Sequence, residues 1–392
     1  MTREFIDFVR IHQNEDTARL LLSAARYPSI DMPMAVQQIE GLRTAREKWP
    51  SLAAADGYLF PPRLNREQAS SETTARYKAS LIGHVGRAAD LTGGMGIDTL
   101  AIAGVADVVD YVEQNEPLCR LEETNFRLLQ RHNITCHSVD CMQWLANQPR
   151  FDLIFIDPAR RSTAGRRVAA FDDCTPNLLS CGPLLRTHCT RMLVKASPMI
   201  DIDLAVQQIG WVEEVHILSV DGECKEVLFL CHEGASEPMI HACAIRSGTT
   251  HKTCFRRSEE LSATPSMCRQ VRHYIYEPDA ALLKAGCFRL LSQRWNVEKL
   301  SSNTHLYTSD TLYTSLAARV YEVIDEIALN RKSIRKAIPS GRASVMSRNY
   351  PVTAAALQRQ LGLGDGGDLC VVATTVGSQP IGLLCRRVQS SF

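Results

Sequence analysis

The stretch Ala89–Ala103 reads ADLTGGMGIDTLAIA and joins a glycine-rich turn to the start of an apolar helical pattern. Gly93, Gly94 and Gly96 allow the backbone to approach a ligand closely, because glycine has no Cβ. The amides that open the following helix would then face that ligand. The stretch therefore predicts a nucleotide-like cofactor at a strand-to-helix turn. An ordinary tight turn, which also favours glycine, remains the alternative.

Apolar strand-like runs alternate with helical patterns after this turn, which predicts a parallel α/β sheet. The first expected strand ends at Asp90–Leu91, and a closing pair of strands turns near Asp221–Gly222. The strands expected between them cover residues 105–114, 134–140, 151–156 and 191–201. Residues 1 to about 75 show apolar side chains at helical spacing, which predicts a helical region ahead of the sheet.

Acidic residues fall at the ends of four successive expected strands, where ligands bind in sheets of this kind. Glu113 lies 17 residues after Gly96, a separation that suits a carboxylate accepting both ribose hydroxyls of an adenosine. Asp140 can meet the adenine amine, Asp90 can lie near the amino end of the ligand, and Asp157 stands where a reacting group would be placed. Aspartate is also a good helix N-cap, so capping is the alternative role for these residues.

Two other nucleotide-binding motifs are absent. A dinucleotide fingerprint would need a third glycine after Gly94-Met95-Gly96, but Asp98 and Thr99 follow instead. A phosphate-binding loop would need a Lys-Ser/Thr pair directly after its glycines, and none follows this turn.

These residues resemble the motifs of class I S-adenosylmethionine (SAM) dependent methyltransferases. Gly94 and Gly96 match the last two glycines of the first motif, and Thr92 replaces the first glycine. Glu113 matches the acid that binds the ribose, and Asp140 the acid on the adenine side. The helix expected to begin near Ser70-Ser71 carries Tyr77 and Lys78 towards the turn, or only covers the sheet edge. The residues expected to bind SAM are Asp90, Thr92, Gly94, Gly96, Asp98, Glu113, Asp140 and Tyr77.

The sequence Asp157-Pro158-Ala159-Arg160 resembles the catalytic fourth motif but departs from the Asp/Asn-Pro-Pro-aromatic form common in enzymes that methylate base amines. The planar guanidinium of Arg160 could stack on a base or bind phosphate. Val194-Lys195-Ala196-Ser197-Pro198 has no cysteine where carbon-5 pyrimidine enzymes can place their nucleophile, which favours a nitrogen or oxygen target. Lys195 could contact the substrate or form a salt bridge. The expected catalytic residues are Asp157, Pro158, Arg160 and Lys195.

Nearly the whole chain resembles bacterial methyltransferases that carry a C-terminal THUMP-like domain. The segments that carry this resemblance are SSETTARYKASLI, DLTGGMGIDT, FIDPARR, VKASPMID, ECKEVLFL and YIYEPDAALLKAGCF. The resemblance implies a doubly wound, Rossmann-like α/β methyltransferase sheet with a helical N-terminal domain and small α+β C-terminal domains. The implied division is helical 1–72, methyltransferase 73–235, ferredoxin-like 236–318 and THUMP-like 319–392. Because THUMP domains occur in RNA-modifying enzymes, it also implies tRNA or rRNA as a partner.

The two parts of the chain differ in charge, although the whole carries a net charge of only +1. Residues 236–392 hold 20 Lys and Arg against 12 Asp and Glu, whereas residues 1–235 hold 24 against 31. A basic segment of this kind suggests a polyanionic partner, or else a solvated surface. Its densest run has six basic residues and no acid, and these are the expected RNA contacts: Arg331, Lys332, Arg335, Lys336, Arg342 and Arg348.

The overall composition is that of a globular protein, with 45% hydrophobic and 22% charged residues. No apolar run approaches the ~18 residues of a membrane span, and the charged start of the chain lacks a signal-peptide core. We therefore expect a cytoplasmic protein. The 14 cysteines include no CxxC pair, which predicts free thiols and no metal site. A small-molecule or protein methyltransferase and a non-catalytic RNA-binding protein remain the alternative functions. The oligomeric state is not predicted.

Overall fold

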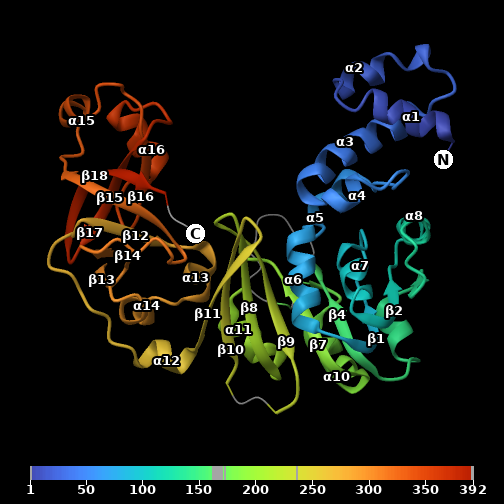
Figure 1. Cartoon of the computed structure of the whole chain (residues 1–392). Helices are drawn as coiled ribbons and strands as arrows, with labels where there is room; N and C mark the ends of the chain where they lie inside the picture. Colours follow the sequence, from blue (N-terminus) through green and yellow to red (C-terminus); the bar gives the residue numbers. More distant parts are fainter. Residues whose placement is uncertain (1, 161–170, 172–173, 235–236, 390–392) are drawn as a thin grey trace. The chain divides into compact units, whose positions relative to one another are not determined.

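The computed structural model describes residues 2–160, 171, 174–234 and 237–389 (Figure 1). These divide into two compact units, one formed by Met1–Glu213 with Leu228–Ala235 and the other by Glu214–Val227 with Ser236–Phe392. Within the described residues, no helix combines the length and apolar character needed to cross a membrane.

The first unit begins with helices, as the sequence predicted. Several start at a side chain that caps backbone amides, including Asp16, Asp31 and Ser71. Phe8, Leu20 and other apolar side chains form a core among the first three α-helices. The helices are α1 (Arg3–Ile11), α2 (Thr17–Leu22), a 3₁₀ turn (Ala24–Arg26), α3 (Met32–Lys48), α4 (Pro50–Ala53), α5 (Arg63–Gln68) and α6 (Glu72–Ile82).

A parallel sheet follows the helices, in the order β7-β4-β1-β2-β3. The central strand β4 has almost no exposed apolar side chain, as expected for a parallel strand covered on both faces. The strands are β1 (Val85–Asp90), β2 (Ala106–Val112), β3 (Ile134–His137), β4 (Phe151–Ile156) and β7 (Cys189–Ala196). The helices between and after them are α7 (Ile97–Ala103), α8 (Glu116–Leu128), α9 (Cys141–Leu145), α10 (Leu178–His188) and α11 (Ile202–Ile209). A short strand pair joins β5 (Ala159–Arg160) to β6 (Cys174–Thr175). The predicted parallel α/β arrangement is confirmed.

The closing strands agree with the sequence prediction in part. The strands β8 (Val212–Val220) and β9 (Glu223–Cys231) flank the predicted turn at Asp221–Gly222, and the unit boundary passes through them. Two further strands, β10 (Met239–Arg246) and β11 (Thr249–Arg256), make the sheet mixed, because β10 runs parallel to β8 and antiparallel to β11. The complete strand order is β11-β10-β8-β9-β7-β4-β1-β2-β3.

The second unit contains a separate seven-stranded sheet with the order β13-β14-β12-β15-β18-β17-β16. The last two strands form a hairpin, since β18 pairs antiparallel with β17 along the whole length of β17. The strands are β12 (Tyr274–Pro278), β13 (Glu298–Ser301), β14 (Thr304–Ser309), β15 (Ala318–Glu326), β16 (Ser344–Ser347), β17 (Leu369–Val376) and β18 (Gln379–Val388). The helices are α12 (Arg257–Ser262), α13 (Ala280–Ala285), α14 (Arg289–Arg294), α15 (Arg331–Ala337) and α16 (Ala354–Leu361).

Candidate active site

The glycine turn lies between β1 and α7 and leaves no room for side chains at two of its positions. A Cβ on Gly93 would lie 2.1 Å from the ring of Tyr111, and one on Gly96 would lie 2.7 Å from Phe126. Gly94 and Gly96 also have positive φ angles of 53° and 69°, which favour glycine. The hydroxyl of Tyr111 donates to the carbonyl of Gly94 at 2.7 Å, so the turn and the ring hold each other in place.

Glu113 follows β2 and is held against the glycine turn. Its Oε2 accepts a hydrogen bond from the backbone amide of Gly94 at 3.1 Å, and its Oε1 accepts one from Asn115 at 2.7 Å. The side chain is half-buried. Since a carboxylate oxygen offers more than one lone pair, both oxygens retain the capacity to accept hydroxyl hydrogen bonds.

Asp90 ends β1 and is almost completely buried, at 1% exposure. Its Oδ1 accepts from the amide of Thr92 at 3.1 Å, and its Oδ2 accepts from the hydroxyl of Thr99 at 2.6 Å. Burial raises the pKa of Asp90 to about 7, and the negative charges of Asp98 and Asp157 contribute to the increase. The carboxyl group of Asp90 is therefore partly protonated at neutral pH.

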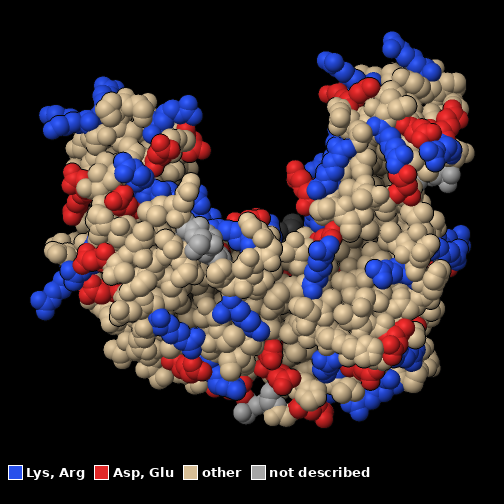
Figure 2. Space-filling model, viewed as in Figure 1, with Lys and Arg blue, Asp and Glu red and all other residues tan. Residues whose placement is uncertain are grey.

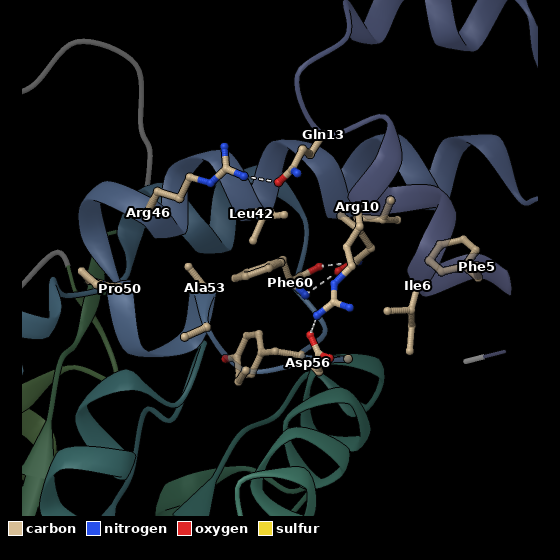
Figure 3. A pocket seen from close by; sticks show the side chains of 16 residues that line it. Phe5, Ile6, Arg10, Gln13, Leu42, Arg46, Pro50, Ala53, Asp56 and Phe60 are labelled. Carbon is tan, nitrogen blue, oxygen red and sulfur yellow. Dashed lines mark hydrogen bonds and ion pairs between the residues drawn. The ribbon is translucent and has the colours of Figure 1, made fainter. Parts of the chain in front are cut away.

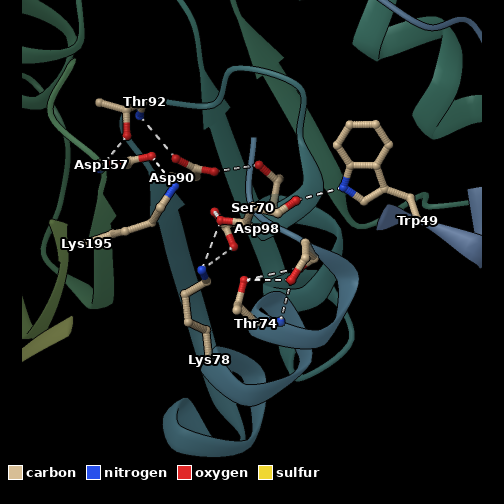
Figure 4. A network of polar contacts seen from close by, with 11 residues as sticks. Trp49, Ser70, Thr74, Lys78, Asp90, Thr92, Asp98, Asp157 and Lys195 are labelled. Carbon is tan, nitrogen blue, oxygen red and sulfur yellow. Dashed lines mark hydrogen bonds and ion pairs between the residues drawn. The ribbon is translucent and has the colours of Figure 1, made fainter. Parts of the chain in front are cut away.

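Thr92 connects the glycine turn to the end of β4 (Figure 4). Its hydroxyl oxygen accepts a hydrogen bond from the backbone amide of Asp157 at 2.7 Å. A glycine at position 92 could not make this contact. Thr92, which replaces the first glycine of the three-glycine motif, thus joins the turn to Asp157 of the fourth motif by a hydrogen bond.

Asp157 and Lys195 form an ion pair at the carboxyl ends of the adjacent strands β4 and β7 (Figure 4). The Asp157 side chain is 34% exposed and that of Lys195 only 11% exposed. Pro158 is buried beside them. The backbone of Arg160 belongs to β5, but its side chain lies outside the described residues. Lys195 therefore forms a salt bridge with Asp157, which is one of the two roles that the sequence analysis considered for it.

A second ion pair lies inside this region, between Lys78 of α6 and Asp98 of α7, at 3.0 Å (Figure 4). Lys78 is 1% exposed, and Ser70 donates a hydrogen bond to Asp98 at 2.7 Å. Burial by itself would raise the pKa of Asp98, but the positive charges of Lys78 and Lys195 and the bond from Ser70 lower it overall. Asp98 is therefore ionised and held by its neighbours.

Asp140 and Tyr77 are the remaining two residues that the sequence analysis expected to bind SAM. Asp140 is exposed and caps α9, accepting from the amides of Met142 and Gln143 at 3.0 and 2.9 Å. Tyr77 is half-buried on α6, one residue before Lys78. Their roles in cofactor binding stay predictions.

Sequence reasoning did not single out Ser70, Thr99 or Glu122. Glu122 of α8 is 0% exposed, and burial raises its pKa well above the usual range. Its Oε2 would lie 3.7 Å from a Cβ on Gly96, so it borders the glycine turn. The sequence did indicate Lys78, because the helix expected to approach the turn includes it. Thr99 and Glu122 lie in ordinary helical patterns and Ser70 precedes a helix, and only the folded chain brings these three to the turn.

The residues predicted to contact RNA lie in the second unit and differ in their surroundings. Arg331, Lys332, Arg335 and Lys336 are exposed on α15. The guanidinium of Arg342 donates to the carbonyl of Asp365 at 3.1 Å, while Arg348 forms an ion pair with the buried Glu277 at 2.6 Å. Four of the six predicted RNA contacts thus lie on the short helix α15, whereas Arg348 is held outside that helix by its ion pair with Glu277.

A cavity of about 590 Å³ lies among α1, α3, α4 and residues 54–60, in the N-terminal helices (Figure 3). Apolar side chains such as Phe5, Leu42 and Phe60 line it, together with Arg10 and Arg46. Arg10 pairs with Asp56, and Arg46 with Gln13. None of the residues predicted from the sequence as site residues lines this cavity.

Comparison with known proteins agrees with this architecture. Residues 274–316 match a family model described as a ferredoxin-like domain, and residues 318–387 match one described as THUMP domain-like. Comparison with curated proteins gave no match. Along 98% of each chain, the structure is similar to that of the "putative methyltransferase from Porphyromonas gingivalis W83", with 29% identity and a TM-score of 0.85.

A weaker likeness involves the T. thermophilus 16S rRNA N2 G1207 methyltransferase in complex with AdoMet and guanosine. It covers 43% of this chain and 44% of that chain, at 13% identity and a TM-score of 0.33, and supports no conclusion about this chain. The full-length match and the two domain matches confirm the resemblance drawn from the sequence: this chain has a Rossmann-like methyltransferase fold joined to a ferredoxin-like and a THUMP-like region.

Proposed function

We propose that the chain is a SAM-dependent methyltransferase acting on a nitrogen or oxygen of a nucleotide in tRNA or rRNA. The observation that carries the proposal is the placement of Glu113 and Asp157. Both lie at the carboxyl ends of parallel strands, and both are bonded to the glycine turn between β1 and α7. Ligands of open α/β sheets bind at this edge.

The residues around the turn fit a SAM molecule. Gly93 and Gly96 pack so closely against the buried rings of Tyr111 and Phe126 that no Cβ fits, and this packing would hold the backbone of the turn in place for a ligand. The carboxylate of Glu113 would hold the two ribose hydroxyls, and Asp140 would meet the adenine amine. When bound, SAM supplies a methyl group made electrophilic by its positive sulfur, and the protein need only align it with the target, an effect worth up to ~7–11 kcal/mol.

Asp157 would orient the target atom and accept its proton. Its carboxylate would accept a hydrogen bond from the N–H or O–H that is to be methylated. Asp157 would accept the proton that the target nitrogen or oxygen gives up when it receives the methyl group. Lys195 holds the carboxylate in place through the ion pair.

SAM binding should strengthen as the pH rises from 6 to 8, because of Asp90. With a pKa of about 7, Asp90 is partly protonated at neutral pH, and a cationic ligand nearby favours its ionised form. Binding below pH 7 therefore requires loss of a proton, so affinity should fall by up to about tenfold per pH unit there. Calorimetric titration across this range measures the slope. Asp90→Asn should flatten it, and an unchanged slope in Asp90→Asn would rule out this origin.

The second unit supplies a basic surface suited to RNA. Lys and Arg side chains gather over α15 (Figure 2), and the exposed ones include Arg331, Lys332, Arg335 and Lys336. No acidic residue lies between Arg331 and Arg348. Because RNA carries one negative charge per nucleotide, such a surface would bind phosphates without reading sequence.

Removing the α15 charges should weaken RNA binding and reduce its dependence on salt. In the variant Lys332→Gln, Arg335→Gln, Lys336→Gln, each lost phosphate contact should lower the slope of log affinity against log salt by about 0.7 to 0.9. Filter binding of cellular tRNA and rRNA at several salt concentrations measures the slope.

The matched control removes the same number of exposed charges elsewhere in the second unit, through Arg269→Gln, Arg386→Gln and Arg387→Gln. This control should keep most of the affinity. Equal losses in both variants would mean that general charge, and not α15, attracts the RNA.

Transfer of a tritiated methyl group from SAM to fractionated cell material tests the proposed substrate directly. Label should enter tRNA or rRNA, and nuclease digestion followed by chromatography should place it on nitrogen or oxygen. Label found only in protein or small molecules would overturn the RNA substrate while leaving the methyltransferase activity intact.

A further inference from the structure

Two histidines and a glutamate gather on the extended part of the first sheet, within the second unit. Glu214 and His216 lie two residues apart on β8, so their side chains share one face of the strand. His241 of β10 is directly opposite His216 in the parallel register, so it points to the same face. Strand pairing therefore places His241 beside Glu214 and His216, although it lies 25 residues further along the chain than His216.

The three side chains converge on one point. The Nε2 of His216 lies 2.7 Å from Oε2 of Glu214, and the Nε2 of His241 lies 3.2 Å from the same oxygen. The imidazole rings stack with centroids 4.3 Å apart and 12° between their planes. One ligand atom from each residue lies within 4.8 Å of the other two. Tetrahedral ligands about 2.0–2.2 Å from a single Zn²⁺ lie roughly 3.3–3.6 Å apart. The His241–Glu214 separation is close to this value, and the His216–Glu214 separation would widen by less than ~1 Å on binding.

One buried nitrogen in this group lacks a hydrogen bond. The side chain of His241 is 9% exposed, and its Nε2 has no hydrogen-bond partner among the described residues although it faces Glu214. The other ring nitrogen, Nδ1, lies 3.1 Å from Sγ of Cys254, the residue opposite His241 on β11. If Nδ1–H donates to that sulfur, the Nε2 lone pair faces a carboxylate lone pair. A cation between them would satisfy both.

The charges and the exposure around the three side chains bear on whether a cation can bind there. Lys252 of β11 adds a positive charge nearby, which opposes a cation. Its side chain is exposed, however, so water screens this repulsion. The Glu214 side chain is 31% exposed and leaves the group reachable from solvent.

We propose that Glu214, His216 and His241 form a binding site for a divalent first-row transition-metal ion, with Cys254 as a positioning residue for His241. Two imidazoles and one carboxylate suit ions such as Zn²⁺ and Fe²⁺ and leave coordination positions open for water or a further ligand. None of its three ligands is among the residues proposed for methyl transfer. Cysteine spacing predicts no metal site here because none of the three ligands is a cysteine.

Calorimetric titration of the full chain with Zn²⁺, after treatment with a chelator, tests the site. Wild type should bind one Zn²⁺ per chain at this site. Loss of a ligand in Glu214→Gln or His241→Gln should weaken binding at least about 100-fold, since removing a group that only supports a ligand already costs about 10–100-fold. Cys254→Ser should weaken binding by about tenfold.

Another Glu–His pair in the chain supplies the matched control. His232 lies 3.9 Å from Glu213, and both side chains are 44% exposed. His232→Gln should bind Zn²⁺ as wild type does. Glu214→Gln retains the size of the side chain, and circular dichroism in the absence of metal should show an unchanged fold. Failure of wild type to bind Zn²⁺, or equal binding by wild type and folded Glu214→Gln, would overturn the proposal.

Discussion

Asp157→Ala should lower the rate of methyl transfer by about 10²- to 10⁴-fold, the usual contribution of a positioned acid or base. The reason is that Asp157 is a partly exposed carboxylate at the end of β4, joined to the glycine turn through its backbone amide. SAM affinity should change little, because that amide, and not the side chain, bonds to Thr92. Single-turnover transfer and calorimetric SAM binding measure the two effects separately.

A second substitution at Asp157 and a control variant separate the possible reasons for this loss of rate. Asp157→Asn can still accept a hydrogen bond from the target but is a poor proton acceptor, so a rate between those of wild type and Asp157→Ala would indicate that orientation accounts for part of the effect. Asp152→Ala is the control, because Asp152 is an exposed aspartate near the start of the same strand. Near-wild-type transfer by folded Asp157→Ala would refute the catalytic role.

Gly93→Ala should abolish detectable SAM binding and lower the free energy of unfolding by about 1–3 kcal/mol or more. The new Cβ would lie 2.1 Å from the ring of Tyr111, which is 0% exposed and bonded through its hydroxyl to Gly94. Neither the ring nor the turn can move without disturbing the other. Urea unfolding and calorimetry measure the two losses.

Gly182→Ala provides the comparison for this substitution. Gly182 lies within α10, and a Cβ there would have no atom within 4 Å apart from its chain neighbours and the helix's own backbone. The gain of roughly 0.5–1 kcal/mol from alanine in a helix is opposed by contact with the ring of Pro183, so the free energy of unfolding should change little. If Gly93→Ala behaved like Gly182→Ala in both measurements, the turn would not have the tight packing described above.

The sequence predicted those features that depend on local pattern. Apolar runs located the parallel strands, and the acids at strand ends placed Asp90, Glu113 and Asp157 around the glycine turn. These predictions succeeded because the carboxyl ends of parallel strands share one edge of the sheet. The helical character of the N-terminal region was also predictable from its 3.6-residue period.

Features that depend on pairing between distant segments escaped prediction. Strands β10 and β11 extend the sheet, and no local signal indicates that His241 will lie opposite His216. Likewise, only the packing of α6 against α7 brings Lys78 to Asp98. In each case the partner is chosen by the register or packing of the folded chain, which a single sequence does not display.

The most direct test of the proposed function is calorimetric SAM binding by wild type and by Glu113→Ala. We expect one SAM per chain in wild type and binding at least about tenfold weaker in the variant, because each lost hydrogen bond to a charged group costs about 1.5–3 kcal/mol. Glu116→Ala, an exposed glutamate three residues later, should bind as wild type does. Absence of SAM binding by folded wild type, both with and without RNA, would contradict the proposed function.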